Sequence, residues 1–435
     1  MDIIKRVSEE IDKTIDKTIE RREKKNIRLF LWGKFVSLVG TYMYSFAMSL
    51  YVLQRTGSGT SFAMNLLLST LPRVVLGPIA GVLADRVERR KMVVGMDILS
   101  GLTILVLLPI SFLFGLRIQF IYASTFLLSI INTFFSVSIS ASLPNMVRKQ
   151  SLVKINSYNQ AAQSVSSILS PILAGIIYNI LPIYVFIALN GITFILSAIS
   201  EMFIDFDLAK EAAEEDEKDK KLDLKSFFDD LKYGFMYFKG QKALFTLLKF
   251  SIVLNFFVNP CMSVVIPFII NKVLLLSEVH YGLIEGSFSV GALISSLVIS
   301  RLPEREKKLP ALMFGTGLSG IVIFLMALPV FSNHKLFSDN VYAAYYMAVM
   351  VLLSVLLMIV NIPIFVLIQK LTPDHMLGRV TSWVETMASG IVPLGLIFMG
   401  IVIDYLPVYY PVLATGLIFL VLTFLMGKSE AMHDL

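Results

Sequence analysis

The stretch from Gly81 to Lys91, GVLADRVERRK, separates two long apolar segments and determines how the rest of the chain is interpreted. The flanking segments, Phe62–Ala84 and Met92–Phe114, are each long enough to cross a bilayer, which takes roughly 20 apolar residues. The loop between them carries the charged residues Asp85, Arg86, Glu88, Arg89, Arg90 and Lys91. Because basic residues of short loops stay on the cytoplasmic side of a membrane, this loop predicts a cytoplasmic connection between two spans.

The composition of the whole chain also indicates a membrane protein. Of its 435 residues, 56% are hydrophobic and only 16% are charged, with a mean hydropathy of +0.75, whereas a soluble domain has about 25% charged residues. Lipid must solvate the apolar surface that no single core can bury. The single cysteine, Cys261, excludes an intramolecular disulfide, and the charged first 28 residues do not form a cleavable signal peptide.

Twelve apolar segments are long enough to span the membrane. In the first half they are Phe30–Leu53, Phe62–Ala84, Met92–Phe114, Gln119–Ala141, Asn156–Ile180 and Ile183–Ile204. In the second half they are Ala243–Ile270, Tyr281–Ser300, Pro310–Val330, Val341–Ile368, Val380–Ile403 and Pro407–Met426. The sequence therefore predicts an all-α membrane protein with about twelve transmembrane helices.

The Lys and Arg residues between these segments predict which side each loop occupies. One set of short loops holds Arg86, Arg89, Arg90, Lys91, Arg148, Lys149, Lys154, Arg301, Arg305, Lys307, Lys308, Lys370 and Arg379. The alternate loops hold only Arg55, Arg117, Lys272 and Lys335. Basic residues mark the cytoplasmic side, so both termini are expected there. The net charge of +6 is spread over these loops, and no nucleic-acid partner is predicted.

The chain divides into five parts at its polar stretches. We predict a cytoplasmic amphipathic segment over residues 1–26 and a six-helix half over 27–206. Residues 207–241 form a charged cytoplasmic linker, whose second part has apolar residues at helical spacing and predicts a helix lying on the membrane face. A second six-helix half follows over 242–427, and residues 428–435 form a cytoplasmic tail.

The two halves repeat each other weakly. SLVKINSYNQAAQS at 151–164 aligns with MLGRVTSWVETMAS at 376–389, and without a gap Gly175 then aligns with Gly400. Each copy follows the fourth span of its half. Parallel repeats of this kind occur in transporters whose substrate site lies between two halves near the middle of the membrane.

With these features in place, the opening loop resembles the signature G-x-L-A-D-R-x-G-R-K/R of major facilitator superfamily transporters. The agreement covers Gly81, Leu83, Ala84, Asp85, Arg86, Arg89 and Arg90, and the departure is Glu88 in place of the usual glycine. Four longer stretches resemble the macrolide-efflux and siderophore-exporter branch: YVLQRTGSGTS at 51–61, and those beginning at Leu71, at Ser151 and at Leu377. The resemblance covers about Ile27 to Met426 and implies two six-helix halves, a bacterial inner-membrane location and no enzymatic activity.

One motif of the fifth span bears on the direction of transport. Ser170-Pro171-Ile172-Leu173-Ala174-Gly175 resembles the G-P-x-x-G-G antiporter motif, keeping Pro171 and Gly175 while Ser170 and Ala174 replace glycines. A proline removes a helix hydrogen bond and small residues allow close helix approach. The resemblance implies export, while ordinary helix packing is the alternative.

Two ionisable residues within the spans are candidates for substrate binding and proton coupling, since buried charges in membranes are costly. Arg73 lies about twelve residues, or some 18 Å of helix, from Asp85. It is expected to line a cavity or to form a structural ion pair. Glu285 lies a turn or two inside the eighth span and is the candidate proton carrier, unless it stays ionised near the surface.

A second group is expected to form an inner gate. The resemblance implies that Asp85 and the loop cations hold the second and third helices against the eleventh in one state. The predicted gate residues are Asp85, Arg86, Arg89, Arg90, Asp97 and Glu385, with Asp97 pairing to Arg86 or Arg90. Lys34, Lys249 and Glu201 are placed near helix ends, where long side chains reach the interface. Asp404 is expected to be solvated.

The remaining motifs point away from other classes of protein. No G-x-x-x-x-G-K-S/T loop is present, so neither ATP nor another cofactor is expected. The four histidines fall in loops or the tail and do not form a metal site. The sequence predicts a monomeric proton-coupled exporter of amphipathic organic molecules, with a small-molecule substrate, protons and lipid as its partners. An importer of a metabolite and a non-transporting sensor or assembly partner remain alternatives.

Overall fold

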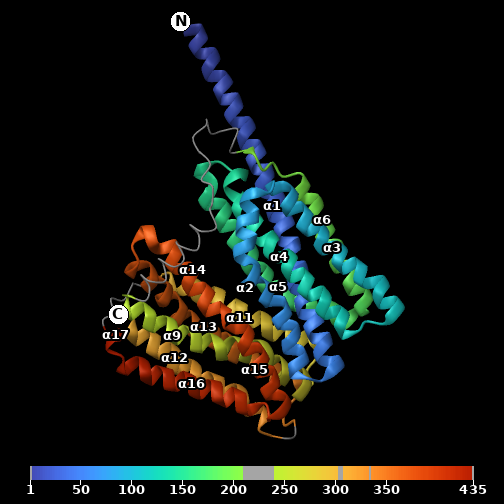
Figure 1. Ribbon diagram of the computed structural model, residues 1–435, viewed down its shortest axis with the longest axis vertical. Helices are drawn as coiled ribbons and strands as arrows, with labels where there is room; N and C mark the ends of the chain where they lie inside the picture. The colour runs from blue at the N-terminus through green and yellow to red at the C-terminus, as the bar shows by residue number, and fades with distance from the viewer. Residues whose placement is uncertain (1, 209–239, 302–306, 333–334, 434–435) are drawn as a thin grey trace. The chain divides into compact units, whose positions relative to one another are not determined.

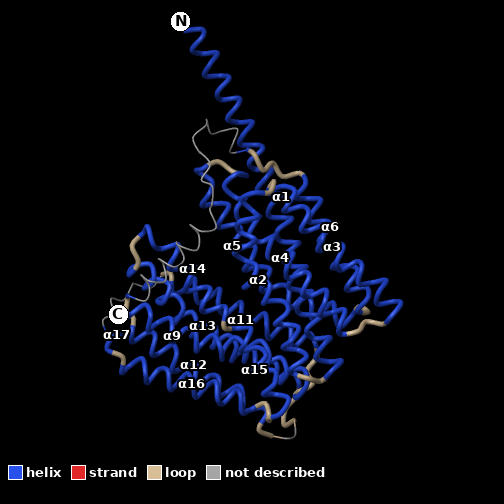
Figure 2. Tube along the Cα trace, viewed as in Figure 1, coloured by secondary structure: helices blue, strands red, loops and turns tan. Residues whose placement is uncertain are grey.

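All regular secondary structure in the described part of the chain is helical. The structure, a computed structural model, describes residues 2–208, 240–301, 307–332 and 335–433. Within these ranges the chain forms helices joined by short loops, without a strand (Figure 2). The predicted linker helix falls on residues 209–239 and lies outside the described residues.

The helices follow one another in two series (Figure 1). The first series comprises α1 (Asp2–Thr56), α2 (Gly59–Arg86), α3 (Arg89–Phe114), α4 (Ile118–Met146), α5 (Leu152–Ile180) and α6 (Ile183–Met202). The second comprises α9 (Lys242–Pro260), α10 (Ile266–Phe268), α11 (Glu278–Ile299), α12 (Leu309–Ala327), α13 (Asp339–Leu371), α14 (Asp374–Gly390), α15 (Val392–Tyr405), α16 (Tyr409–Lys428) and α17 (Glu430–His433). Two π-helical turns, η2 (Cys261–Val265) and η3 (Ile269–Val273), continue the line of α9 and α10.

The helix lengths confirm the prediction of an all-α multi-pass membrane protein. In the described residues, eleven helical segments are long and apolar enough to cross a membrane. The helix α2, with 28 residues, lies at the position of the second predicted span; at about 1.5 Å per residue it exceeds the thickness of a hydrocarbon core. The eleventh predicted span consists of two helices, α14 and α15, which meet at Ile391 just before Pro393.

The chain forms two compact units, and three long helices contribute to both. Unit 1 contains residues 1–44, 75–166 and 182–220, and unit 2 contains residues 45–74, 167–181 and 221–435. The helices α1, α2 and α5 therefore each have one part in unit 1 and the other part in unit 2. As a result, unit 2 combines parts of three first-series helices with the second series.

The segment before Ile27 is continuous with the first span. It is the first part of α1, which runs without interruption from Asp2 to Thr56 over 55 residues (Figure 1). No glycine or proline occurs before Gly33, so nothing in the sequence ends the helix between the charged segment and the apolar span.

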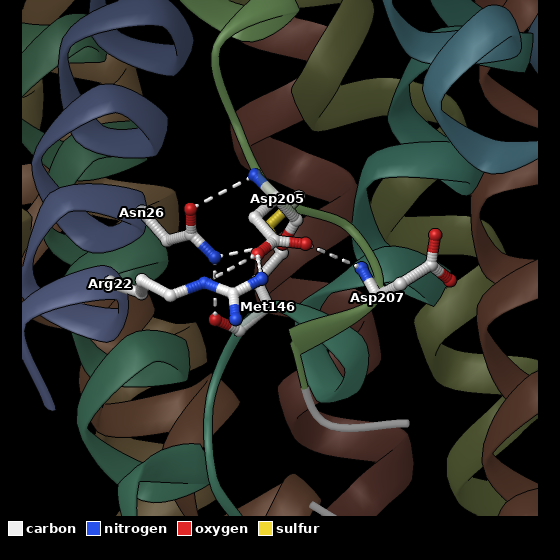
Figure 3. A network of polar contacts seen from close by, with 5 residues as sticks. All are labelled: Arg22, Asn26, Met146, Asp205 and Asp207. Carbon is white, nitrogen blue, oxygen red and sulfur yellow. Dashed lines mark hydrogen bonds and ion pairs between the residues drawn. The ribbon is translucent and has the colours of Figure 1, made fainter. Parts of the chain in front are cut away.

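A polar network fastens α1 to the rest of unit 1 (Figure 3). The amide nitrogen of Asn26 donates to the carbonyl oxygens of Met146 (3.0 Å) and Asp205 (2.8 Å), and its amide oxygen accepts from the Asp205 backbone N–H (3.0 Å). Arg22 Nε donates to Asp205 Oδ2 at 3.1 Å. The end of α4 and the segment after α6 are thereby held against the same two turns of α1.

An ion pair next to this network holds the α4–α5 loop. Arg148 Nε donates to Glu23 Oε2, and its Nη1 donates to Asp16 Oδ1, both at 2.8 Å. The side chain of Glu23 is only 4% exposed, against 21% for Arg148. The Glu23 carboxylate raises the pKa of the Arg148 guanidinium above its usual value. Arg148 is therefore the counter-charge that allows a carboxylate to be buried here.

We expect Arg148→Met to lower the stability of the protein by about 3 kcal/mol, because it leaves the buried Glu23 carboxylate without its partner. Thermal unfolding of the purified protein in detergent measures this loss. The double variant Glu23→Gln/Arg148→Met should recover much of it, whereas Lys335→Met, which breaks the exposed pair of Lys335 with Asp339, should have little effect. Equal losses in the single and double variants would contradict the role given to Arg148.

Candidate functional site

A groove between α1 and α5 is one cavity of unit 1 with room for a small molecule. Its volume is about 540 Å³, within the range of typical ligand pockets, roughly 300–1,000 Å³. It is lined by Arg28, Leu31, Trp32, Phe35, Tyr158, Ala161, Ala162 and Val165. Three of these side chains are aromatic and one is a cation, so the groove suits a molecule with a large apolar surface.

Polar side chains on α5 are neighbours in sequence of the groove residues Tyr158 and Ala161. Ser157 and Gln160 are exposed, although they lie within a 32-residue segment that is apolar enough to span a membrane.

A cluster of three buried ionisable residues lies on the other side of α1. Lys34 (α1), Asp97 (α3) and Glu201 (α6) are 3%, 0% and 1% exposed, and we name them the Lys34 cluster. The prediction that Lys34 and Glu201 extend to the interface is wrong: both point into unit 1, where the Lys34 ammonium acts electrostatically on both carboxyls. It also lies 5.1 Å from the centroid of the Phe135 ring.

Small residues create the space for this cluster. A Cβ at Gly33 would come within 3.1 Å of Glu201 Cγ, so glycine allows the glutamate to lie against α1. Gly101 of α3 and Gly191 of α6 form a close crossing, in which a Cβ on either residue would meet the carbonyl oxygen of the other at 3.1–3.4 Å. Because α3 and α6 approach so closely, Asp97 and Glu201 come near enough for their charges to interact.

Hydroxyl groups provide the hydrogen bonds of the cluster. Ser37 Oγ donates to Asp97 Oδ1 at 3.0 Å. Ser197 Oγ lies 2.8 Å from the Gly33 carbonyl oxygen, to which it donates, and 3.5 Å from Glu201 Oε1. Among the described residues, Asp97 Oδ2 and Glu201 Oε2 are buried without a hydrogen-bond partner.

The predicted gate residues are placed as follows. Asp85 and Arg86 end α2 and Glu385 lies in α14, but their side chains are outside the described part of the structure. Arg89 begins α3 and is half-buried, while the exposed Arg90 donates to the Met202 carbonyl oxygen at the end of α6. The Asp97 carboxylate contacts Ser37 and not Arg90 in the described hydrogen bonds. The gate role of this group stays a prediction.

Glu285 and Arg73 lie in unit 2. Glu285 is half-buried on α11, where its carboxyl interacts with the hydroxyl of Tyr281 one turn earlier. The Tyr281 ring stacks on Phe46 of α1, with centroids 4.6 Å apart. Arg73 is exposed on α2. The described contacts do not join Arg73 to Glu285, so their common role in coupling stays a prediction.

The antiporter-like motif forms a very close helix crossing within unit 2. A Cβ on Gly175 would meet the Glu278 carbonyl oxygen at 2.4 Å, and a Cβ on Gly282 would meet the Pro171 carbonyl oxygen at 2.4 Å. Ser170 is fully buried beside this crossing. The helices α5 and α11 therefore touch backbone to backbone, which only glycine permits at these positions.

The aligned residue of the repeat makes an equivalent crossing. A Cβ on Gly400 of α15 would meet Ala63 Cβ at 2.5 Å and the Gly59 carbonyl oxygen at 2.9 Å on α2. Nearby, Asp404 is exposed, as expected, and it also accepts hydrogen bonds from Ser58 Oγ (2.8 Å) and from the backbone N–H groups of Gly59 (2.6 Å) and Thr60 (3.0 Å). It thus caps the first turn of α2 from another helix. We name the two glycine crossings together the glycine closure.

The two-series fold and the membrane-spanning lengths define a multi-pass membrane protein, and comparison with known proteins gives its family and its class as a transporter. The sequence profile of the Major Facilitator Superfamily matches residues 30–396. The chain belongs to this superfamily, whose members are secondary transporters and not enzymes.

Individual relatives agree with this assignment. Macrolide efflux protein A of Streptococcus pyogenes is 25% identical over 393 residues, covering 89% of this chain and 91% of the relative. Macrolide efflux protein A of Enterococcus faecalis is 26% identical over 346 residues, covering 78% of this chain and 100% of the relative. The crystal structure of a bacterial homologue of the iron transporter ferroportin in the inward-facing state superposes with a TM-score of 0.69 at 19% identity, over 93% of this chain and 98% of that one; it supports the fold.

We expect Gly175→Ala and Gly400→Ala each to abolish most transport, because the added methyl group forces apart two helices of the glycine closure. Gly77→Ala in α2 and Gly95→Ala in α3 are matched controls, since nothing lies within 4 Å of a Cβ at either position. Initial rates of substrate accumulation in membrane vesicles, at equal protein levels, measure the effect. Wild-type rates in both closure variants would show that the crossings are dispensable.

Proposed function

We propose that this protein is a proton-coupled exporter of amphipathic organic molecules such as macrolide-like drugs, working by antiport and alternating access. The observation that carries the proposal is the similarity to macrolide efflux proteins along nearly the whole chain. We place the protein in the bacterial inner membrane with both termini in the cytoplasm, as the distribution of Lys and Arg indicates.

The groove between α1 and α5 supports a bulky, largely apolar substrate. Trp32, Phe35 and Tyr158 offer wide aromatic surfaces, while the described lining residues include no carboxylate to bind a cation by charge. A macrolide has a large lactone ring with broad apolar faces, and such faces gain most from aromatic and aliphatic contact. In the proposal these three side chains hold the substrate.

The glycine closure supports alternating access. With the loops placed as the basic residues indicate, both crossings lie on the outer side of the membrane, where they seal the space between first-series and second-series helices of unit 2. Opening them would give the substrate its exit. In the proposal Glu285, one turn from the stacked Tyr281 and Phe46, takes up a proton from outside, and Arg73 faces the transport path.

Everted membrane vesicles with an imposed pH gradient, acid inside, test the proposal directly. We expect accumulation of a radiolabelled macrolide that stops when a protonophore collapses the gradient. Accumulation that survives collapse would favour a facilitator, and absence of transport for macrolides and dyes, with folded protein confirmed, would favour the non-transporting alternative.

We further expect Trp32→Ala to raise the KM for the macrolide about tenfold, a loss near ~1.4 kcal/mol, because it removes a large aromatic surface from the groove. Phe314→Ala is the matched control, since Phe314 is an exposed aromatic residue on α12 and is not among the residues that line the groove. KM values from concentration-dependent vesicle uptake give the comparison. An unchanged KM in Trp32→Ala would exclude the groove as the substrate site.

A further inference from the structure

The proposed function gives roles to Arg73 and Glu285 and none to the Lys34 cluster. The charges within this cluster do not balance. Two carboxylates and one ammonium carry a net charge of −1 when all three groups are ionised. The three side chains are almost completely buried. An uncompensated charge inside a protein within a membrane is strongly unfavourable. One added proton makes the cluster neutral.

The helices around the Lys34 cluster carry no other charge that could balance its excess negative charge. Lys34 is the single charged residue of α1 between Arg28 and Arg55, α4 has none, and Glu201 is the single one of α6. On α3 the other charged residues are Arg89, Arg90 and Lys91 at its start, where Arg90 is exposed and bonded to Met202. Within the described residues, Lys34 is the one cation that acts on either carboxyl.

The hydrogen bonds also leave room for a proton. Ser197 has one hydroxyl hydrogen, which points to the Gly33 carbonyl oxygen at 2.8 Å. It cannot at the same time be donated to Glu201 Oε1 at 3.5 Å or to the Asp97 carboxyl. Two buried carboxyl oxygens, Asp97 Oδ2 and Glu201 Oε2, have no hydrogen-bond partner in the described structure. A buried polar atom without a partner marks a place for a missing ligand or proton.

We propose that the Lys34 cluster binds one exchangeable proton, shared between Asp97 and Glu201. A proton from the aqueous side adds to a free carboxyl oxygen, and no other bond forms or breaks. The Lys34 ammonium disfavours a metal cation at this site, because its positive charge already acts on both carboxyls. Its presence also means that one proton, and not two, restores neutrality.

The helix α1 connects this proton site with the substrate groove. At about 3.6 residues per turn, Lys34 and Ser37 lie on the side of α1 opposite to Trp32 and Phe35. When the proton leaves, both carboxyls are negatively charged and attract the Lys34 ammonium more strongly. This attraction pulls on the turns of α1 that also carry the groove residues Trp32 and Phe35. This coupling rests on the proposed function, whereas proton binding itself does not.

Infrared difference spectra of the purified full-length Glu285→Gln protein between about pH 5 and about pH 9 test the proposal, because this parent variant lacks the other proposed proton carrier. The parent should show the carbonyl stretch of a buried carboxylic acid, which disappears at high pH. Asp97→Asn and Glu201→Gln, each added to the parent, should remove this band, because one carboxylate then pairs with Lys34 and needs no proton. The matched control Asp404→Asn should retain it.

Two results would overturn the proposal: absence of a buried carboxylic acid band in the Glu285→Gln parent at every pH, or its persistence when either Asp97→Asn or Glu201→Gln is added to that parent. Thermal unfolding identifies any variant that does not fold, and Asp97→Glu, which keeps the carboxyl, should restore the band. Because the spectra need no substrate, their outcome is independent of the vesicle assays. A band without macrolide transport would contradict the proposed function and leave the proton site standing.

Tryptophan fluorescence can test the connection through α1 separately. The chain has two tryptophans, Trp32 in the groove and Trp383, which can be replaced. In a Trp383→Phe background, the fluorescence of Trp32 should change with pH over the range in which the carboxyl band disappears. The change should be lost in Asp97→Asn. A band that titrates while Trp32 does not respond, or a response that survives Asp97→Asn, would contradict the link between the cluster and the groove.

Discussion

Burial of the Lys34 ammonium is the constraint on which unit 1 depends, because a charge at this depth must be matched by neighbouring groups. Asp97 and Glu201 come from helices that cross at Gly101 and Gly191, and Gly33 gives Glu201 its place against α1. The ammonium therefore fixes which faces of α1, α3 and α6 meet. Because two carboxylates lie near one ammonium, the cluster has one carboxylate in excess. We propose that this excess carboxylate binds a proton.

Unit 2 combines an apolar core with two places where helices meet backbone to backbone. Its two glycine crossings join α5 to α11 and α2 to α15, and they use residues that the internal repeat aligns, Gly175 and Gly400. The Asp404 cap adds hydrogen bonds to one of these crossings. A methyl group at either glycine would separate the helices, so both crossings depend on glycine. The long helix α1 contributes residues to both units.

Much of this fold follows from the sequence. Apolar length predicted the order of the long helices, and the internal repeat aligned Gly175 with Gly400, the two residues that the structure places at helix crossings. The Lys34 cluster was not predicted, since Lys34 and Glu201 near span ends were taken to extend to the interface. The signal was present: one lysine, one aspartate and one glutamate, each the lone charge within an apolar span, lie toward the same side of the membrane. Which faces of α1, α3 and α6 meet depends on tertiary packing, and periodicity within a single helix does not contain that information.

The groove also could not be predicted from the periodicity of a single helix, because its aromatic residues come from both α1 and α5. Trp32 and Tyr158 lie 126 positions apart in the sequence. In our proposal a proton site and a substrate groove share α1. Calorimetric titration of the purified protein with a macrolide, repeated in buffers of different ionisation enthalpy, counts the protons released on binding. We expect release of about one proton from the wild type and none from Asp97→Asn. Equal proton release from both proteins, or none from either with binding intact, would show that the groove and the proton site are not coupled.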